Sequence, residues 1–355
     1  MSKRGGKKLA LLVWLSSWAG GVCEAQGAVS GIFGYCNLTL LGNSDTIVSV
    51  PFARPSAADA TVASFSGNTV QFSGPPGWTN GQFVYVAGSQ SNTYYFRING
   101  GALEGRHYDI TNNTSNSVTL DLKGDSLAGL SAGDAVSVLP HWTLGTVFVN
   151  GRGIHPTTDP DERQTEVLIP NIAGAGINLS AAATYYFYTN AGTAAWRQAG
   201  SASPNRNDDV LAPNVFLIIR HKVPTNTVFT SFGDVILTKV AIPLRGNPTN
   251  RQDNPVAMPR PVDLTPNDTG LIESGAFVPT LNPGARKDEL LVFDNFTTNF
   301  NKSAVATYYY HGSAWRQVGS TADHGTSNVF SPGAGFIIRK ASGGSSTTWT
   351  NAPTY

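Results

Sequence analysis

The chain has 355 residues and a formal net charge of +1, and only 13% of its residues are charged. This charged share is about half of that in an average soluble domain. The near-neutral balance gives no electrostatic basis for binding nucleic acids or anionic membranes. The length allows more than one hydrophobic core, and we therefore expect two or three domains.

The N-terminal segment has the three parts of a secretory signal peptide. Four of residues 1–8 are lysine or arginine, the apolar run Leu9–Leu15 follows, and small residues lead to a cleavage position near Ala25. The apolar run is far shorter than the ~20 residues needed to span a bilayer. We predict a signal peptide over 1–25 and a secreted chain that is extracellular, periplasmic or at the cell surface, with no transmembrane segment after cleavage. An uncleaved anchor is the alternative.

The use of cysteine agrees with a fold that depends on its hydrophobic cores. The chain has two cysteines, and cleavage near Ala25 removes Cys23. The remaining Cys36 has no partner for an internal disulfide, although the chain enters an oxidising compartment. Cys36 lies in an alternating segment, where a small buried side chain is favoured over a reactive thiol.

The apolar segments are short, β-branched or aromatic, and separated by glycine, asparagine or proline, a pattern typical of an all-β fold. Segments 35–40 and 46–52 alternate on either side of the turn Gly42–Asp45 and predict a hairpin. The N-terminal region, 26–142, is expected to form a small β-barrel or sandwich, and we favour the barrel. Its expected strands lie near 62–65, 69–72, 83–87, 93–98, 106–110, 117–122 and 134–139.

The second half of the chain contains one pattern twice. Trp-Arg-Gln occurs at 196–198 and at 315–317, preceded each time by a tyrosine-rich segment and followed by an Ile-Ile-Arg segment. We therefore predict two copies of a β-sandwich-like repeat, over 143–240 and 267–355. The proline-rich segment 241–266 between them is expected to be an irregular linker.

A change of length between the two copies predicts a hairpin in each. The tyrosine segments at Thr184 and Thr307 are 123 positions apart, whereas Trp196 and Trp315 are 119 apart. Four residues are thus lost between these segments, and hairpin tips tolerate such losses better than paired strands do. We expect turns at 190–193 and at 311–313.

Candidates for catalysis or metal binding fail on their context. The string Gly129–Gly133 matches the G-x-S-x-G pattern of serine hydrolases, but strand-forming residues follow it where that motif requires a helix. None of the six histidines recurs in both copies, and His155 with the nearby Asp159 and Asp161 lacks the ligand order of known metal sites. We expect no enzyme, no metal and no cofactor.

Charged residues at matched positions are interpreted as a structural ion-pair network, because a general acid–base pair would need two carboxylates with different environments. These residues are Glu166 with Glu289, Arg197 with Arg316, and Arg220 with Arg339.

Aromatic residues of the repeats are the remaining candidates for ligand binding. Trp196, Trp315, Tyr186 and Tyr309 are the candidates for stacking on a sugar ring. A tryptophan on a strand more often packs in a core, and we favour core packing. Buried indoles would remove the stacking hypothesis.

Several motifs occur together: 46–54, 81–88, 105–108, 124–127, 142–146, the two Trp-Arg-Gln and Ile-Ile-Arg segments, and the ending Trp349–Tyr355. In this combination nearly all of the chain after residue 25 resembles a family of uncharacterised secreted proteins from Verrucomicrobia-type bacteria. The resemblance implies a secreted β-rich protein and brings no catalytic residues.

From these observations we predict a secreted, non-enzymatic structural or adhesion protein of the cell envelope or extracellular matrix. Surface polysaccharide or other envelope proteins are the expected partners. A carbohydrate-binding protein that uses the repeat aromatics is the alternative, and a secreted hydrolase is a third hypothesis.

Overall fold

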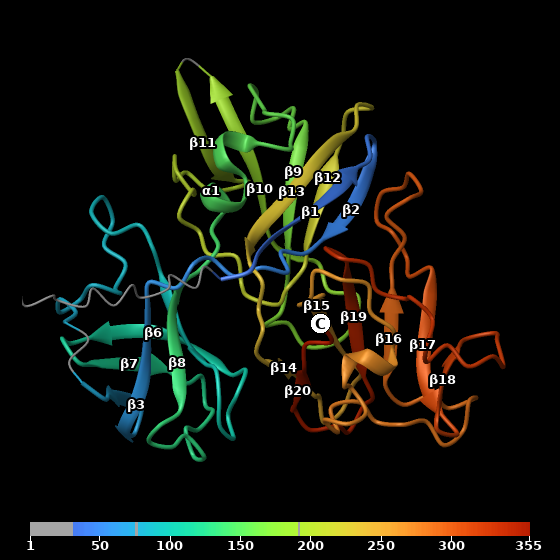
Figure 1. Cartoon of the computed structure of the whole chain (residues 1–355). Helices are drawn as coiled ribbons and strands as arrows, with labels where there is room; N and C mark the ends of the chain where they lie inside the picture. Colours follow the sequence, from blue (N-terminus) through green and yellow to red (C-terminus); the bar gives the residue numbers. More distant parts are fainter. Residues whose placement is uncertain (1–30, 75–76, 191) are drawn as a thin grey trace, which may run out of the picture. The chain divides into compact units, whose positions relative to one another are not determined.

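The computed structural model describes residues 31–74, 77–190 and 192–355, and the predicted signal peptide over 1–25 lies outside them. Twenty strands run through these residues (Figure 1), and the helical segments among them are three short turns, α1 (Leu144–Val147), η1 (Val149–Gly151) and η2 (Asn267–Thr269). The all-β prediction is confirmed.

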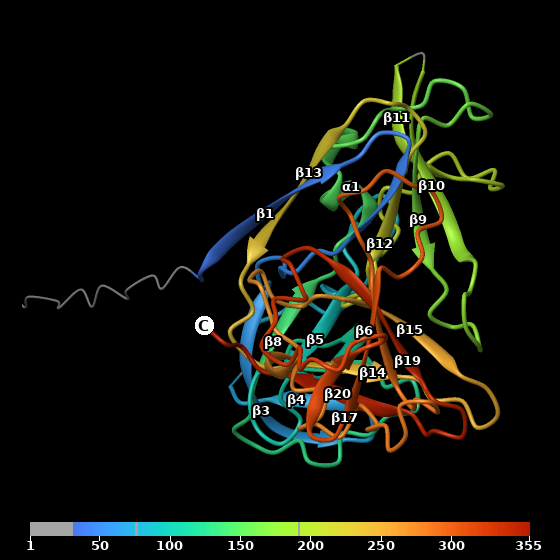
Figure 2. The same ribbon diagram turned by 90° about the vertical axis from the view of Figure 1, so that its right-hand side faces the viewer.

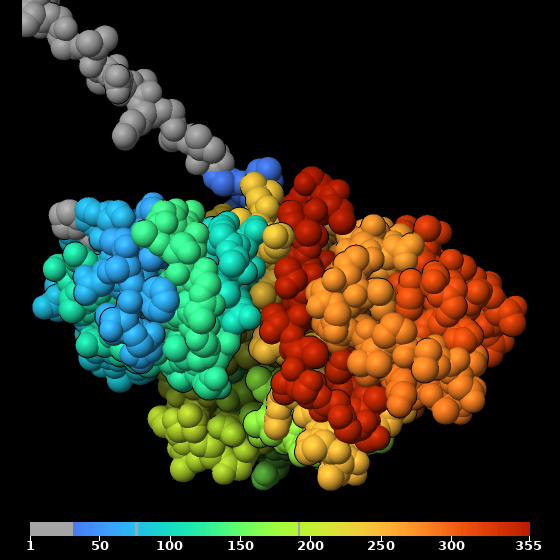
Figure 3. All heavy atoms as spheres, turned by 90° about the horizontal axis from the view of Figure 1, so that it is seen from below, coloured from blue at the N-terminus to red at the C-terminus, as the bar shows by residue number. Residues whose placement is uncertain are grey.

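Six strands near the N-terminus form a closed barrel in the order β3-β4-β7-β6-β5-β8. Its interior is filled by apolar side chains such as Val62, Phe96 and Val118, each with 0% exposure. The barrel is therefore a packed core, and its atoms form one continuous body in Figure 3, coloured blue to green. The strands are β3 (Ala58–Ser66), β4 (Thr69–Phe72), β5 (Tyr94–Ile98), β6 (His107–Asn113), β7 (Ser117–Asp121) and β8 (Ala135–Pro140).

The segment 83–87, predicted as a strand, forms turns instead. Phe83 is buried between Trp78 and Tyr94, with ring centroids 5.0 and 5.1 Å away. Its backbone N–H donates to the side-chain oxygen of Asn113 at 2.9 Å. In this segment the side chain of Phe83 is buried in the barrel core, and its burial does not require the segment to pair with another strand.

Two five-stranded sheets have the same strand order, β11-β10-β9-β12-β2 and β18-β17-β16-β19-β15. Both hairpins predicted from the length change are confirmed, because Asn190 pairs with Thr193 and His311 pairs with Ala314. The strands of the first sheet are β2 (Ser44–Val48), β9 (Thr165–Pro170), β10 (Ala181–Asn190), β11 (Thr193–Gln198) and β12 (Leu217–His221). Those of the second are β15 (Gln252–Ala257), β16 (Glu289–Val292), β17 (Ala306–His311), β18 (Ala314–Gln317) and β19 (Gly335–Lys340).

A two-stranded ribbon accompanies each of these sheets. In the first ribbon β1 (Phe33–Leu40) pairs with β13 (Thr227–Asp234), and in the second β14 (Val240–Leu244) pairs with β20 (Thr347–Asn351). We call β1, β2 and β9–β13 module 1, and β14–β20 module 2. The barrel is thus an insertion between β2 and β9 of module 1.

Two predictions about connections are wrong. Segments 35–40 and 46–52 do not form a hairpin, because β1 pairs with β13 and β2 pairs with β12. Segment 241–266 is not an irregular linker, because it contains most of β14 and all of β15. Its prolines are compatible with strands at these places, since Pro243 lies in a two-stranded ribbon and Pro255 lies in the edge strand β15.

The turn after the first strand of each module explains a glycine that both modules share. A Cβ atom on Gly42 would lie 2.2 Å from the carbonyl oxygen of Pro224, and one on Gly246 would lie 2.3 Å from that of Gly344. Only glycine fits where two backbones approach so closely. The motif Leu-x-Gly-Asn, at 40–43 and 244–247, is therefore a signal that the modules begin earlier than the predicted repeats.

We expect Gly42→Ala to lower the free energy of unfolding by about 2 kcal/mol or more, because backbone atoms must move to admit the Cβ atom. Gly100→Ala is the matched control, since a Cβ atom there has no neighbour within 4 Å. Urea denaturation of both variants checks this. Equal midpoints would contradict the close approach.

Candidate functional site

The four aromatic residues proposed to stack on a sugar are buried: Trp196 is 0%, Trp315 1%, Tyr186 6% and Tyr309 7% exposed. Trp196 packs against Phe148, with ring centroids 5.3 Å apart. A buried ring has no free face for a pyranose, so stacking on these residues is excluded. Trp196 and Trp315 belong to the module cores. Tyr186 and Tyr309 are covered by arginines, with the guanidinium of Arg163 5.7 Å from the Tyr186 ring centroid and that of Arg286 5.9 Å from the Tyr309 ring centroid.

Each of the two matched glutamates forms ion pairs with two cationic side chains. Glu166 accepts from Arg163 at 2.7 Å and from Lys222 at 2.9 Å. Burial raises the pKa of Glu166, but the hydrogen bonds from Arg163 and Lys222 outweigh it, and the net pKa lies below its ordinary value. This carboxylate is therefore held ionised and is unsuited to act as a general acid.

Glu289 of module 2 has the same arrangement. It accepts from Arg286 at 2.7 Å and from Arg251 at 2.9 Å. Both glutamates are in ion pairs, as predicted from the sequence. Their partners, however, are none of the four arginines that were predicted to take part.

The matched arginines divide into two kinds. Arg220 donates from Nε and Nη2 to Asp45 at 2.7 and 2.8 Å, and Arg339 donates in the same way to Asp253 at 2.7 and 3.0 Å. Such two-pronged pairs are strong and directional.

Arg197 and Arg316 are not in ion pairs among the described residues, and that part of the prediction is wrong. The guanidinium of Arg197 lies 3.7 Å from the ring centroid of Tyr188, a cation–π contact. Arg316 donates from Nη1 to the carbonyl oxygen of Thr321. Both arginines therefore support their own hairpin and loop.

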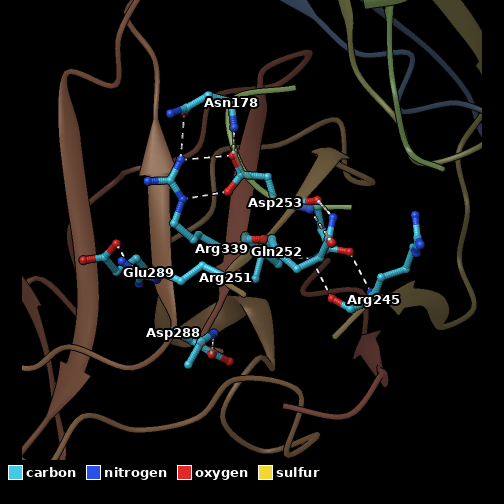
Figure 4. Close-up of polar contacts among 12 residues, drawn as sticks. Asn178, Arg245, Arg251, Gln252, Asp253, Asp288, Glu289 and Arg339 are labelled. Atoms are coloured by element: carbon cyan, nitrogen blue, oxygen red, sulfur yellow. Dashed lines mark hydrogen bonds and ion pairs between the residues drawn. The ribbon is translucent and has the colours of Figure 1, made fainter. Parts of the chain in front are cut away.

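Each two-pronged pair is completed by an asparagine from the other module. Asn178, in the β9–β10 loop of module 1, donates its backbone N–H to Asp253 at 2.9 Å and accepts from Arg339 at 3.1 Å. Figure 4 shows Arg339 bridging Asn178 and Asp253. We call this contact and its counterpart in module 1 the clasp.

The counterpart of this contact has the same hydrogen bonds, with the roles of the two modules exchanged. Asn301, in the β16–β17 loop of module 2, donates its backbone N–H to Asp45 at 2.7 Å and accepts from Arg220 at 2.7 Å. Both asparagines have positive φ, 53° at Asn178 and 50° at Asn301. Their spacing is 123 positions, the same as that of the tyrosine segments, and this was the signal that the sequence analysis missed.

Backbone hydrogen bonds extend the clasp on both sides. Asp45 N donates to Asn299 O, and Asp253 N donates to Gly176 O, both at 2.9 Å. Each edge strand, β2 or β15, thus receives the loop of the opposite module along its open side. The clasp also protects these edges from pairing with another chain.

A buried pair differs between the modules at equivalent positions. In module 2, Lys340 lies 2.5 Å from Asp288, and their side chains are 1% and 0% exposed. In module 1 the same places hold His221 and Thr165, whose Nδ1 and Oγ1 lie 2.9 Å apart. A neutral hydrogen bond thus replaces an ion pair, and burial, with a smaller effect of His155, lowers the pKa of His221 to about 4.

The remaining candidates for chemistry lack a complete set of groups. His141 lies 2.9 Å from Asp109, but its other ring nitrogen has no hydrogen-bond partner among the described residues. Ser131 of the G-x-S-x-G string lies in a loop before β8, and its backbone bonds to Asp134, so no helix presents a nucleophile. Burial raises the pKa of the Cys36 thiol, which does not activate it.

His155, which is close to Asp159 and Asp161 in sequence, contacts the backbone of another loop. His155 Nε2 lies 2.9 Å from the carbonyl oxygen of Thr225. Within residues 31–74, 77–190 and 192–355, no group of three histidine, cysteine, aspartate or glutamate side chains is placed to hold a metal ion.

Figure 2 shows the β1·β13 ribbon at one side of the fold. One face of this ribbon has exposed side chains, several of them aromatic. Phe33, Tyr35, Val228 and Phe232 are 61%, 71%, 54% and 36% exposed. Phe33 and Phe232 have ring centroids 6.1 Å apart. On the opposite face of each ribbon an aromatic residue is buried at the matching position, Phe229 in module 1 and Trp349 in module 2. We call the exposed residues the ribbon face.

No helix in the described part of the chain is both long and apolar enough to cross a membrane. Comparisons with known protein families, with curated proteins and with solved structures found no match.

We expect Asp288→Thr to lower the free energy of unfolding by about 3–5 kcal/mol, because it leaves the Lys340 charge buried and unpaired. The double variant Asp288→Thr, Lys340→His introduces the pair found in module 1 and is expected to recover most of this loss. Urea denaturation of the two variants checks the prediction. A double variant no more stable than the single one would show that the positions are not equivalent.

Folding holds the pKa of His221 at about 4, below the ordinary value of 6.5. Between these pH values the unfolded chain binds more protons than the folded chain, so stability present above pH 6.5 is lost as the pH falls toward 4. We expect a smaller loss in His221→Gln. Urea unfolding at pH 7, 5.5 and 4 measures it. Equal pH dependence in both proteins would contradict the assignment.

Proposed function

We propose that this protein is a secreted scaffold of the cell envelope or extracellular matrix that acts by surface contact through the ribbon face. The observation that supports it is the difference between the two ribbons. The strands of the module 1 ribbon have eight residues each and those of the module 2 ribbon have five. The additional residues of module 1 include the exposed Phe33, Tyr35 and Phe232. If the two modules are copies of one unit, as we also propose, a specific role belongs where they differ.

The composition of the ribbon face favours contact with another surface. Single exposed apolar residues are common on proteins, whereas clustered ones mark interaction sites. Burial of one large apolar side chain contributes about 1.5–3 kcal/mol. Several rings on one rigid ribbon would therefore give useful affinity with little ordering cost.

The state of the ionisable groups supports a structural role over an enzymatic one. The aspartates and glutamates at matched positions are bound by arginine or lysine, as in Asp45 with Arg220 and Glu289 with Arg286. These contacts stabilise strands and the clasp. Secretion, and kinship with the uncharacterised secreted family, belong to the same proposal.

A carbohydrate partner is the second candidate, because the ribbon face also has polar neutral groups between its rings. Thr230 donates to Asn37 at 2.7 Å on this face. Exposed aromatic rings stack on the apolar face of a pyranose, and nearby hydroxyl and amide groups bond its hydroxyls. The rings of the ribbon face thus replace the buried ones in the predicted carbohydrate function.

We expect Tyr35→Ser and Phe232→Ser each to weaken binding to the producing cell's surface about tenfold, which corresponds to the loss of about 1.4 kcal/mol of contact energy. Phe296→Ser is the matched control, because Phe296 is an 84% exposed aromatic residue of module 2. Binding of labelled protein to washed cells measures the effect.

Fractionation of the producing cells tests secretion at the same time. Recovery of the protein in the cytoplasm, or equal binding by all three variants, would contradict the proposal. A glycan array distinguishes the partners: sugar binding that is lost in Tyr35→Ser supports the carbohydrate function, and an array without binding supports a protein partner.

A further inference from the structure

A cavity of about 70 Å³ lies next to the outer side of barrel strands β5 and β6. Its walls are mainly apolar and include Phe52, Trp142, Pro213, Val240 and Pro259. Three titratable side chains, Tyr95, Arg97 and His107, line it as well. The cavity therefore combines an apolar body with one polar end, as small-molecule sites do.

The walls of the cavity are tied together by backbone hydrogen bonds. Ala241 N donates to Gly105 O at 3.0 Å, and Ala257 N donates to Asn214 O at 2.9 Å. Trp142 Nε1 donates to the carbonyl oxygen of Phe52 at 2.8 Å. The cavity is thus formed before any ligand binds, which lowers the ordering cost of binding.

Arg97 at the polar end has an unused donor. Its Nε donates to Asn99 at 2.9 Å, but its Nη1 is buried and has no hydrogen-bond partner among the described residues. His107 is its pairing partner in the neighbouring strand. A buried guanidinium donor without a partner costs free energy, and a ligand acceptor would remove that cost.

The acids closest to Arg97 and His107 along the barrel are engaged elsewhere. Asp109 is paired with His141 at 2.9 Å and with Lys123 at 2.7 Å, and Glu104 is paired with Lys239 at 3.2 Å. No carboxylate forms an ion pair with Arg97 among the described residues. Arg97 reaches a carboxylate only indirectly, since Asn99 and Ser137 link it to Asp59 through hydrogen bonds. The polar end of the cavity is therefore positively charged, without a direct carboxylate partner.

A second buried cation adds to this charge. Arg260 is 0% exposed, and its guanidinium donates to carbonyl oxygens, including that of the cavity residue Ile236 at 2.6 Å. Burial, and to a smaller extent the positive charge of Arg97, lower the pKa of Arg260. An anion bound near Arg97 would stabilise both charges.

We propose that this cavity binds a short-chain carboxylic acid, with Arg97 Nη1 and His107 donating to the carboxylate and the apolar walls enclosing the hydrocarbon part. A hydrogen bond between a guanidinium and a carboxylate is charge-assisted and stronger than one between neutral groups. The small volume restricts the hydrocarbon part to a few carbon atoms. This site is separate from the ribbon face, so it stands or falls independently of the proposed function.

Propionate titrated into the full chain, followed by isothermal calorimetry and by the histidine resonances in NMR, tests the proposal. We expect saturable binding, a raised pKa of His107 in the bound state, and binding at least about tenfold weaker in Arg97→Gln, the loss of one charged hydrogen bond. Arg152→Gln is the control, since Arg152 is an exposed arginine outside the cavity and its loss should leave binding unchanged.

Propionamide has the same shape without the charge and is expected to bind at least about tenfold more weakly than propionate to the unaltered protein. This comparison keeps the test valid if Arg97→Gln does not fold. Equal affinity for the acid and the amide, equal affinity in Arg97→Gln, or no saturable binding of propionate would each overturn the proposal.

Discussion

The two-pronged pairing of an arginine with an aspartate, once in each module, is the constraint on which the rest of the structure depends. Asp45 and Asp253 lie on edge strands and are 3% and 4% exposed, so their charges need hydrogen-bond partners there. The arginine donates two hydrogen bonds to the aspartate, and the backbone N–H of a loop asparagine in the other module donates a third. Neither module completes its pair alone, and the two modules therefore depend on each other.

This mutual dependence explains where the modules are alike and where they differ. Positions that form the clasp have the same residue types in both modules, because each must fit the loop of the other. Some positions away from it differ, as in Asp288 and Lys340 of module 2 against Thr165 and His221 of module 1. The ribbon face, which includes Tyr35, is another difference.

The sequence predicted elements well and their partners less well. The barrel and both Tyr–Trp hairpins follow from local alternation and from a length change at a turn. Alternation shows which face of a strand is buried, but it does not identify the strand that accepts its hydrogen bonds, and β1 and β2 were therefore paired wrongly. Asp45 and Arg220 are brought together only by that pairing. For Trp196 the sequence favoured core packing and left stacking on a ligand as the alternative, because a core and a binding platform use the same residue type.

The insertion of the barrel has a consequence for the order of folding. Strand β2 finds its partner β12 only after the whole barrel and most of module 1 have been made, as Val48 pairs with Leu217. Long-range pairings of this kind form slowly, whereas the barrel closes through contacts within 58–140. We expect the barrel to fold first during synthesis, and the exposed edge of β2 to be the segment most in need of a chaperone until β12 emerges.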